Sequence, residues 1–379
     1  MKAAILSAPL PIDQRPLQIS DVANPRLRSG HVLLRVRACG VCRTDLHIAE
    51  GELPPKQLRL IPGHQIVGEV IDGAVDGLAL GSRVGVSWLG GTDGTCPYCI
   101  RGMENLCDSP TFTGYTIAGG YAEYAFVRND FVFPLPPALD DLHAAPLLCA
   151  GIIGFRSLRV AGVQPGERVG LFGFGASAHL AIAVLQAWKC EVYVSTRGES
   201  HRALAESLGA NWIGNETDKP PVELDRALTF APSGEVVLAA LASLRKGGVV
   251  AINAIHLDRM PEFDYDRLLW SCDVNFVRGE DSFAFGDERL RRLVQLAHVL
   301  ASPGSGVVDR IIPRTVSGRQ SSRRLLLRPP RPHRAFCRAS PQGLCMSMKT
   351  PPAGFPCVPA KIFFRAGVAQ LVERRLPKP

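Results

Sequence analysis

The chain of 379 residues is 46% hydrophobic and 21% charged, which is typical of a globular protein with a sizeable core and room for two domains. The formal net charge of +8 is unevenly spread. Residues 314–379 hold 14 Lys and Arg against the single acid Glu373, and this net charge of +13 leaves −5 for residues 1–313. A mildly acidic body argues against a nucleic-acid-binding protein.

Two further patterns indicate a cytoplasmic protein without a membrane span. The chain has no run of about 18 apolar residues, and its start, MKAAILS, predicts a first strand rather than a signal peptide. Three of the eleven cysteines, Cys96, Cys99 and Cys107, lie close together. Closely spaced thiols in a cytoplasmic chain are more often metal ligands than disulfide partners.

The first strongly patterned stretch begins at residue 31. Residues 31–38 alternate apolar and basic side chains from Leu34 onward, which predicts a half-buried strand that ends at a turn. Cys42 follows in that turn, and His64 and the distant Cys149 are side chains of types that bind zinc. Three protein ligands with one open position are characteristic of a catalytic zinc site.

The motif CRTDLH at residues 42–47, followed by GHQ at residues 63–65, resembles the zinc-dependent alcohol dehydrogenases of the medium-chain dehydrogenase superfamily. The resemblance covers roughly the first four fifths of the chain. It implies a GroES-like β-rich catalytic domain joined to a Rossmann domain, with zinc bound by Cys42, His64 and Cys149. It also implies oxidation of an alcohol to an aldehyde or ketone by hydride transfer to NAD(P)⁺, or the reverse reaction.

The same resemblance assigns roles to the residues around the metal. Thr44 accepts the proton of the alcohol and His47 passes it toward solvent. Asp45 holds the far ring nitrogen of His64 and so selects the tautomer that binds metal. Arg43 faces the pyrophosphate of the cofactor.

Two residues next to the motif, Cys39 and Gln65, are not expected to bind the metal or to carry the proton. Cys39 could be imagined as a second ligand beside Cys42, but we expect it to pack as a small apolar residue. Gln65 stands where most relatives have Glu, so a negative charge near the metal is missing. We expect altered metal or product exchange rather than lost chemistry.

Further short strands at residues 66–71 and 83–88, separated by Gly and Asp, predict a β-barrel-like domain. By resemblance, Trp88 lines the alcohol pocket and Leu53 narrows it from the other side. Both residues equally suit a hydrophobic core. Small or medium aliphatic or aromatic alcohols fit this expectation.

A second metal site is implied by the spacing of Cys96, Cys99 and Cys107, which matches the structural zinc lobe of many relatives. That lobe normally opens with a fourth cysteine, and here the position holds Asp93. A carboxylate could complete the tetrahedron around a structural zinc. The alternative is a lobe held by packing, with three free thiols.

A dinucleotide-binding pattern follows. Residues 168–172 predict a buried strand, and an apolar helix is predicted over 179–188. Between them, Gly173 allows a tight turn, Gly175 lets the backbone approach a pyrophosphate, and Ala178 takes the last place of the G-x-G-x-x-G/A motif.

The next predicted strand, residues 191–195, decides between the two nicotinamide cofactors. An NAD site usually presents an acid at its end, whereas this chain has Ser195, Thr196 and Arg197. Without the carboxylate nothing repels a 2′-phosphate, and Arg197 could pair with it, which favours NADP. NAD stays open, because Arg197 could instead stack on adenine and Ser195 could bond a plain ribose.

Strands and helices continue to alternate, with strands at 227–230, 249–255 and 273–277 and helices at 234–244 and 287–300. By resemblance, Ile255 lies near the nicotinamide. The strand at 273–277 is often the seam of a dimer in the family, so we expect a homodimer or homotetramer.

The expected organisation has four parts: a GroES-like zinc-binding catalytic domain (1–150), a Rossmann domain (151–278), a return to the catalytic domain that need not be complete (279–313), and a tail (314–379). The tail holds 10 of the 30 prolines and no sustained periodicity, which predicts disorder. Its composition favours translation out of frame from about residue 300 to 320 onward. The alternative is a basic tail that binds RNA or an acidic partner.

Two functions of different classes follow from these patterns. The first is a zinc-dependent alcohol dehydrogenase that uses NADP or NAD. The second is a non-catalytic or impaired zinc- and nucleotide-binding protein of the same fold, its activity lost through Gln65, Asp93 or the altered C-terminus.

Overall fold

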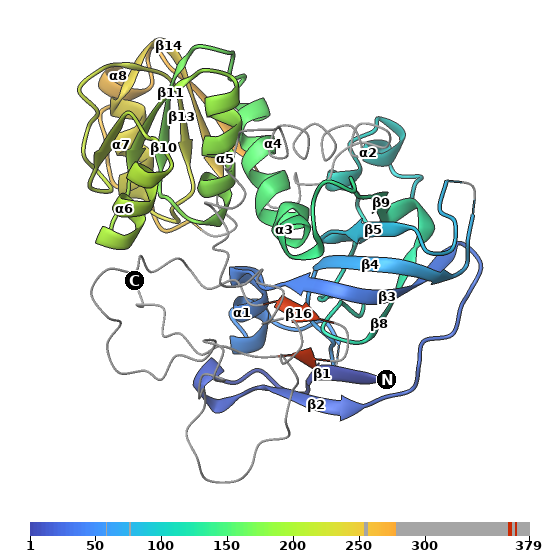
Figure 1. Cartoon of the computed structure of the whole chain (residues 1–379). Helices are drawn as coiled ribbons and strands as arrows, with labels where there is room; N and C mark the ends of the chain where they lie inside the picture. Colours follow the sequence, from blue (N-terminus) through green and yellow to red (C-terminus); the bar gives the residue numbers. More distant parts are fainter. Residues whose placement is uncertain (58, 76, 254–256, 278–362, 366–367, 370–379) are drawn as a thin grey trace.

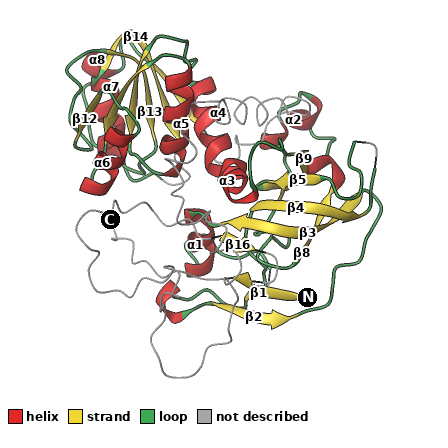
Figure 2. Ribbon diagram, viewed as in Figure 1, coloured by secondary structure: helices red, strands yellow, loops and turns green. Residues whose placement is uncertain are grey.

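Two sheets of different kinds organise the molecule in the computed structural model (Figures 1 and 2). The structure describes residues 1–57, 59–75, 77–253, 257–277, 363–365 and 368–369. An antiparallel sheet forms the N-terminal half, and a parallel sheet follows it. The helices α3 (Asp141–Pro146) and α4 (Ile152–Val160) lie between the two sheets in Figure 1. No helix in the described part of the chain is both long and apolar enough to cross a membrane.

The antiparallel sheet is centred on β3 (His31–Gly40), whose Val32, Leu34 and Val36 are buried while Arg35 and Arg37 are exposed. This alternation is what a strand with one core-facing side requires. The other strands are β4 (Gln65–Asp72), β5 (Arg83–Val86), β8 (Tyr124–Arg128), β9 (Val132–Pro134), β16 (Phe363–Arg365) and β17 (Val368–Ala369). Their order is β17-β16-β3-β4-β5-β9, and β8 also pairs with β3.

The register of β3 and β4 has a direct consequence for the site. Gly40, at the end of β3, pairs with Gln65, at the start of β4. The turn that contains Cys42 is therefore brought beside His64, although the two residues are 22 positions apart. This antiparallel pairing places two of the three predicted zinc ligands at one end of the sheet.

Smaller elements surround this sheet. The strands are β1 (Lys2–Leu6), β2 (Leu17–Asp21), β6 (Leu89–Gly91) and β7 (Thr111–Phe112). The helices are η1 (Ile12–Gln14), α1 (Arg43–Glu50), α2 (Pro97–Ile100), η2 (Glu104–Leu106), η3 (Asn129–Phe131) and the π-helical η4 (Leu147–Gly151). In Figure 1, α1 lies at the end of the antiparallel sheet nearest the parallel sheet.

The parallel sheet has the strand order β12-β11-β10-β13-β14-β15, with every neighbouring pair parallel. Its strands are β10 (Arg168–Phe172), β11 (Glu191–Ser195), β12 (Trp212–Gly214), β13 (Leu224–Thr229), β14 (Leu244–Asn253) and β15 (Asp273–Val277). Its helices are α5 (Ala176–Ala187), α6 (Glu199–Ser207), α7 (Gly234–Ala242) and α8 (Tyr265–Leu268). This is the doubly wound order, and it reverses between β10 and β13, where such sheets bind nucleotides.

Both faces of the parallel sheet are covered by helices. Val169 and Leu171 of β10 belong to the core cluster shared with α4 and α5, whereas Phe172 belongs to the cluster on the side of α7. Strands buried on both faces are expected in a parallel sheet. The predicted fold class, a GroES-like β-rich part joined to a Rossmann sheet, is confirmed.

Some predicted boundaries differ from the structure. The helix predicted from residue 179 begins at Ala176, because the motif glycine itself, Gly175, is the N-cap of α5. The strand predicted at 83–88 ends at Val86, and a separate strand, β6, begins at Leu89. The strand predicted from residue 249 begins at Leu244, where β14 already pairs with β13.

Part of the predicted organisation cannot be compared with the structure. Ile255, the helix at 287–300 and most of the tail lie outside the described residues. Within the tail, β16 and β17 are described, and β16 pairs antiparallel with the end of β3 through Phe363 opposite Gly40. The C-terminal end of β3 extends beyond its pairing with β8, which leaves a strand edge with which β16 pairs.

Candidate active site

Cys42, His64 and Cys149, here called the three-residue site, come together from three different elements. Cys42 is the N-cap of α1, His64 directly precedes β4, and Cys149 lies in η4. The Nε2 atom of His64 is 3.2 Å from Sγ of Cys42 and 3.4 Å from Sγ of Cys149. All three donor atoms lie within 4.8 Å of one another.

These distances fit zinc. With usual zinc–sulfur and zinc–nitrogen bond lengths, two ligand atoms of a tetrahedral site lie about 3.5 Å apart. The two printed sulfur–nitrogen separations, 3.2 and 3.4 Å, are close to that value. Two thiols and one imidazole nitrogen could therefore hold one ion and leave its fourth position open.

Asp45 holds two parts of the three-residue site at once. Its Oδ1 is 3.1 Å from Nδ1 of His64, and its Oδ2 accepts a hydrogen bond of 2.8 Å from the backbone N–H of Cys42. The side chains of Asp45 and His64 are 3% and 1% exposed, so water cannot compete for these contacts. The imidazole is thereby fixed with Nε2 directed toward the sulfurs.

Local sequence explains why Cys42 presents its sulfur here. The backbone of Cys42 is extended, its Sγ accepts the N–H of Thr44 at 3.3 Å, and Asp45 completes a capping box at the start of α1. In the segment before β4, Gly63 has a φ of +95°, and a Cβ atom there would lie 2.4 Å from the ring of Tyr121. Only glycine allows the turn that leads into His64.

The ionisable groups of the three-residue site shift one another's pKa values. A hydrogen bond with Cys149 lowers the pKa of the Cys42 thiol well below its usual range against the effect of burial, and the charge of His64 lowers it further. Burial alone would lower the pKa of His64, but the negative charges of Cys42 and Asp45 raise it well above its usual value. A thiol that readily loses its proton is a good metal ligand.

Cys39 lies apart from this set. It is fully buried in the core of the antiparallel sheet, and its Sγ donates weakly to the carbonyl of Gly40 at 3.7 Å. Burial raises the pKa of its thiol well above the usual value. Cys39 therefore has the environment of a small apolar residue.

Aromatic side chains form a wall beside the three-residue site. The ring of Trp88 meets that of His64 edge to face, with centroids 5.1 Å apart. Trp88 also stacks on Phe112 at 5.1 Å and on Tyr115 at 5.6 Å. Leu53 and Trp88, the two predicted pocket residues, pack against the same apolar cluster.

Thr44 and His47 occupy one face of α1, because residues three apart in a helix lie on the same side. Thr44 is buried and His47 is half-buried. Nδ1 of His47 contacts a carboxylate oxygen of Glu52, just beyond the end of the helix. Arg43 is exposed at the first position of α1.

Asp93, Cys96, Cys99 and Cys107, here called the lobe cluster, also have donor atoms within 4.8 Å of one another. Backbone N–H groups arrange them: Oδ1 of Asp93 accepts from Thr95 at 2.8 Å and from Cys96 at 2.9 Å, and Sγ of Cys107 accepts from Asp93 at 3.3 Å. Hydrogen bonds from Cys96 and Thr95 hold the pKa of Asp93 well below its usual range. One carboxylate and three sulfurs fit a closed tetrahedral zinc site.

The glycine turn after β10 has the form that a pyrophosphate needs. Gly173 has a φ of +87°, and a Cβ atom there would lie 2.8 Å from the backbone nitrogen of Ala231. A Cβ atom at Gly175 would meet nothing within 4 Å, so the space over this residue is open. Gly175 begins α5 without a side-chain cap, which leaves the first N–H groups of the helix available to an anion.

The end of β11 supports that turn from behind. The carbonyl of Ser195 accepts the N–H of Gly173 at 2.8 Å, and Oγ1 of Thr196 accepts the N–H of Phe174 at 3.2 Å. The hydroxyl of Ser195 donates to the carbonyl of Asp218 at 3.1 Å, and Ser195 and Thr196 are both buried. Arg197 is exposed.

Comparison with known proteins places this geometry in a family. The alcohol dehydrogenase GroES-like domain family matches residues 28–137. The protein named "Probable alcohol dehydrogenase AdhA" from Mycobacterium tuberculosis (strain CDC 1551 / Oshkosh) is 47% identical over 277 residues, which are 71% of this chain and 80% of that protein. The chain belongs to the zinc-dependent alcohol dehydrogenase family. An alcohol dehydrogenase of Geobacillus stearothermophilus is 36% identical over 280 residues, 71% of this chain and 82% of its own length.

Solved structures of the family have the same fold. A protein assigned as a zinc-binding dehydrogenase from Sinorhizobium meliloti 1021, bound to NADP, has a TM-score of 0.68 and 26% identity, covering 78% of this chain and 88% of its own. A cobalt- and zinc-bound thermostable alcohol dehydrogenase from Pyrobaculum aerophilum has a TM-score of 0.67 and 24% identity, with coverage of 78% and 88%. A shorter match, to the elongation-factor P rhamnosyltransferase EarP family, covers residues 228–286 and includes neither sulfur-rich cluster.

Gln65 lies directly after His64 of the three-residue site, at the start of β4. Its side chain is fully buried, and neither amide atom has a hydrogen-bond partner among the described residues. The amide lies over Gly40, where a Cβ atom would be 3.0 Å from Oε1. The expected effect of Gln65 on metal or product exchange stays a prediction.

Sequence reasoning missed two residues that contact the predicted ones. Glu52, which contacts His47, lies in a polar stretch after α1 that gave no signal of its own. Tyr121 lies under Gly63 and close to Asp45, and burial together with the charge of Asp45 raises its pKa well above the usual value. Nothing in the periodicity around Tyr121 could have indicated this contact, because it depends on packing.

Proposed function

We propose that this chain oxidises an alcohol to an aldehyde or ketone, or runs the reverse reaction, with zinc held by the three-residue site and NADP or NAD as the hydride carrier. The observation that carries the proposal is the convergence of two sulfurs and one imidazole nitrogen within 4.8 Å. The buried carboxylate of Asp45 on the far nitrogen of His64 supports it, since metal-binding histidines are commonly held in this way.

The residues of the three-residue site would act as the ligands. When bound, zinc lowers the pKa of an alcohol oxygen by its Lewis acidity, and the nicotinamide ring accepts the hydride. Cys42 and Cys149 bind as thiolates and His64 as a neutral imidazole through Nε2. Asp45 keeps the proton of that imidazole on Nδ1, and Trp88 excludes water from one side of His64.

A proton path would run along α1. The hydroxyl of Thr44 accepts the proton of the alcohol, and His47 takes it toward solvent through Nε2. The contact between Glu52 and Nδ1 of His47 supports this path, because it favours the tautomer that leaves Nε2 free to accept a proton. The half-buried position of His47 connects the buried Thr44 with water.

The cofactor would bind at the glycine turn formed by Gly173 and Gly175, with its pyrophosphate on the N-terminus of α5 and near Arg43. NADP is the favoured form because Arg197 is exposed, and its ion pair with Glu216, 3.8 Å from Nε, is weak because both side chains face solvent. Replacing Arg197 by Ala should weaken NADP at least about tenfold relative to NAD, since one charge-assisted contact is worth 1.5–3 kcal/mol. The exposed Arg101 is a control whose loss should change neither.

The substrate would lie against Trp88 and Leu53, which suits small or medium aliphatic or aromatic alcohols. The lobe cluster would hold a second, structural zinc, with Asp93 in place of a cysteine. The short distances among its four donor atoms support this second zinc. The alternative is a lobe held by packing, with free thiols.

The decisive experiment measures reduction of NAD and NADP by a panel of alcohols together with the zinc content, beside a Cys42→Ser control. About two zincs per chain with alcohol-dependent reduction support the proposal. Nucleotide binding without turnover, equal in the wild type and in Cys42→Ser, would favour the non-catalytic alternative.

The remaining expectations concern the whole molecule. We propose a cytoplasmic homodimer or homotetramer, with the division between catalytic and Rossmann domains at about residue 151. Free thiols at all eight described cysteines support a reducing compartment, and the edge position of β15 supports association through that strand. Light scattering of the purified chain tests the assembly, and a monomer would contradict it.

A further inference from the structure

Cys149 is held differently from the other two residues of the three-residue site. Cys42 and His64 flank the paired ends of β3 and β4, so the sheet itself determines their separation. Cys149 instead lies in η4, which follows α3 and belongs to no strand. Its position relative to the sheet depends on how α3 and η4 are attached.

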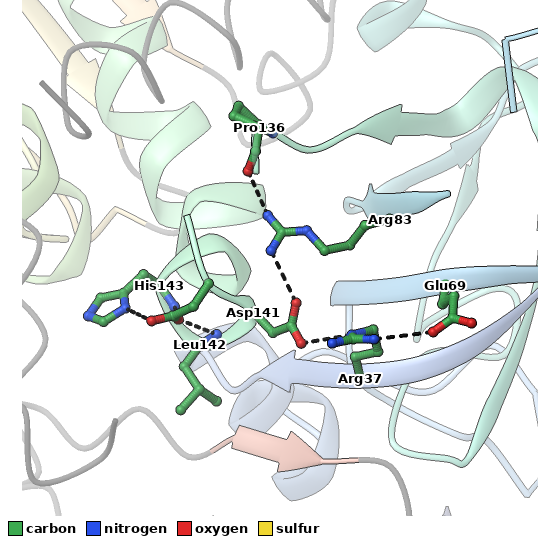
Figure 3. Close-up of polar contacts among 8 residues, drawn as sticks. Arg37, Glu69, Arg83, Pro136, Asp141, Leu142 and His143 are labelled. Carbon is green, nitrogen blue, oxygen red and sulfur yellow. Dashed lines mark hydrogen bonds and ion pairs between the residues drawn. The ribbon is translucent and has the colours of Figure 1, made fainter. Parts of the chain in front are cut away.

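One attachment is an ionic cluster at the start of α3, shown in Figure 3. Oδ2 of Asp141 accepts a hydrogen bond of 2.8 Å from Nε of Arg37, on β3. Oδ1 of the same carboxylate accepts one of 3.3 Å from Arg83, on β5. Asp141 and Arg83 are 22% and 23% exposed, so their charges are partly shielded from water, whereas Arg37 is 45% exposed.

Both arginines are themselves fixed by a second partner. Arg37 donates to Glu69 of β4 at 3.1 Å, and Arg83 donates to the carbonyl of Pro136 at 2.8 Å. Figure 3 shows the resulting chain of contacts from Glu69 through Arg37, Asp141 and Arg83 to Pro136. The carboxylate of Asp141 thus binds α3 to side chains that cannot move freely.

The second attachment lies beside Cys149. A Cβ atom at Gly85 of β5 would lie 2.4 Å from Cδ2 of Leu148, so Leu148 packs directly on the backbone of β5. Between Asp141 and Leu148 the chain changes from α-helix to the wider π-helical turn of η4. Because an irregular turn does not transmit a fixed geometry, these two attachments contribute to the position of Cys149, together with the packing of Leu147 and Ala150 in the hydrophobic core.

We propose that Asp141 is a positioning residue of the metal site: by clamping α3 to β3 and β5, it sets the distance of Cys149 from Cys42 and His64. Asp141 touches neither metal nor substrate. The inference rests on the proposed function, in which Cys149 is a zinc ligand. Loss of the clamp leaves Cys149 on a less constrained helix and weakens the grip on the ion.

The test compares Asp141→Asn with Asp225→Asn in the full chain. Asp225 is a matched control, because it is also 22% exposed and accepts from an arginine Nε, that of Arg245 at 2.6 Å, in the parallel sheet. Zinc release to a coloured chelator is followed by absorbance, and the visible spectrum of the cobalt-loaded protein reports the ligand geometry. We expect release of the Cys149-dependent zinc to be about tenfold faster in Asp141→Asn. We expect a changed cobalt spectrum in that variant and neither effect in Asp225→Asn.

Equal release rates and equal cobalt spectra in the two variants would overturn the inference. If Asp141→Asn yields no folded protein, Arg83→Gln removes one of the two donors, and the same acceleration is expected there and its absence counts equally against the clamp. Cys149→Ser separates this result from the proposed function. If the wild type and Cys149→Ser hold the same zinc, the proposed function fails; if they differ but Asp141→Asn behaves as Asp225→Asn does, only the clamp fails.

Discussion

The three-residue site and the lobe cluster use similar donor atoms but are assembled over different distances in the chain. The lobe cluster lies entirely within residues 93–107, whereas His64 and Cys149 in the three-residue site are 85 positions apart. In the lobe cluster Asp93 is exposed and only Cys107 is buried, whereas His64 of the three-residue site is 1% exposed. A turn with backbone hydrogen bonds is enough for the first, and the second requires the folded sheet and helices.

This difference predicts how each cluster responds to change. Damage to the lobe should remain local and affect stability, because its ligands are arranged by neighbouring N–H groups. A substitution that disturbs any element carrying a ligand of the three-residue site should lower zinc binding and turnover. The following predictions test this contrast, from the largest effect to the smallest.

Cys149→Ser should abolish the three-residue site and leave the lobe cluster intact. We expect the loss of about one zinc per chain and a fall in alcohol-dependent NAD(P)H formation of at least about 10³-fold, since Lewis acidity contributes several kcal/mol. Metal analysis and cofactor absorbance measure both. Cys190→Ser is the control, because Cys190 is buried outside both clusters and binds the carbonyl of Gln164. Unchanged zinc content in Cys149→Ser would contradict the assignment.

Asp45→Asn should weaken zinc at the three-residue site by about 10- to 100-fold, the usual effect of losing a carboxylate behind a metal-binding histidine. The amide would place a donor group against either the N–H of Cys42 or the ring of His64. Competition with a chelator of known affinity measures the change. Asp21→Asn, which alters an exposed pair with Lys2, should have no effect. Equal zinc affinity in the two variants would argue that Asp45 merely caps α1.

Asp93→Cys should strengthen the lobe cluster without changing turnover, because a fourth thiolate is a softer ligand for zinc than a carboxylate. We expect slower zinc release and a melting temperature higher by about 2 °C, equivalent to about 1 kcal/mol. Asp108→Cys adds a thiol beside Cys107 at an exposed position outside the ligand set and is the matched control. Unchanged zinc release together with unchanged melting would remove the lobe from the metal sites.

Asp140→Ala tests α3, the helix that precedes the turn with Cys149, through the pH dependence of its stability. The carboxylate accepts the N–H groups of Leu142 and His143, each at 2.9 Å. Burial opposes ionisation, but hydrogen bonds from His143 outweigh it and lower the pKa of Asp140. A lowered pKa stabilises the fold above the ordinary carboxyl pKa, and this contribution is lost as pH falls through the lowered value.

We therefore expect Asp140→Ala to cost about 1 kcal/mol at neutral pH and progressively less below about pH 4. Urea unfolding at several pH values measures the difference between the two proteins. Asn also caps a helix but carries no charge, so Asp140→Asn should lose less stability than Asp140→Ala at neutral pH. A difference that stays constant into the acid range would show that the charge of Asp140 is unimportant.

The local parts of both clusters could be predicted from the sequence. The alternation at residues 31–38 indicated β3, and Gly173 and Gly175 indicated the turn before α5. Such patterns are readable because strand alternation, helix caps and glycine conformations are decided by residues a few positions apart. The boundaries were less readable: Trp88 lies between two strands instead of within one.

Chain order and residue type by themselves determined the donor atoms, the sheet types and the family. Only the tertiary structure decided that Ser195 and Thr196 turn inward to support the glycine turn, and that Glu52 meets His47. It also decided that Asp141 links α3 to two strands. These contacts join residues whose separation in the chain carries no periodic signal, so their formation depends on the packing of whole elements against one another.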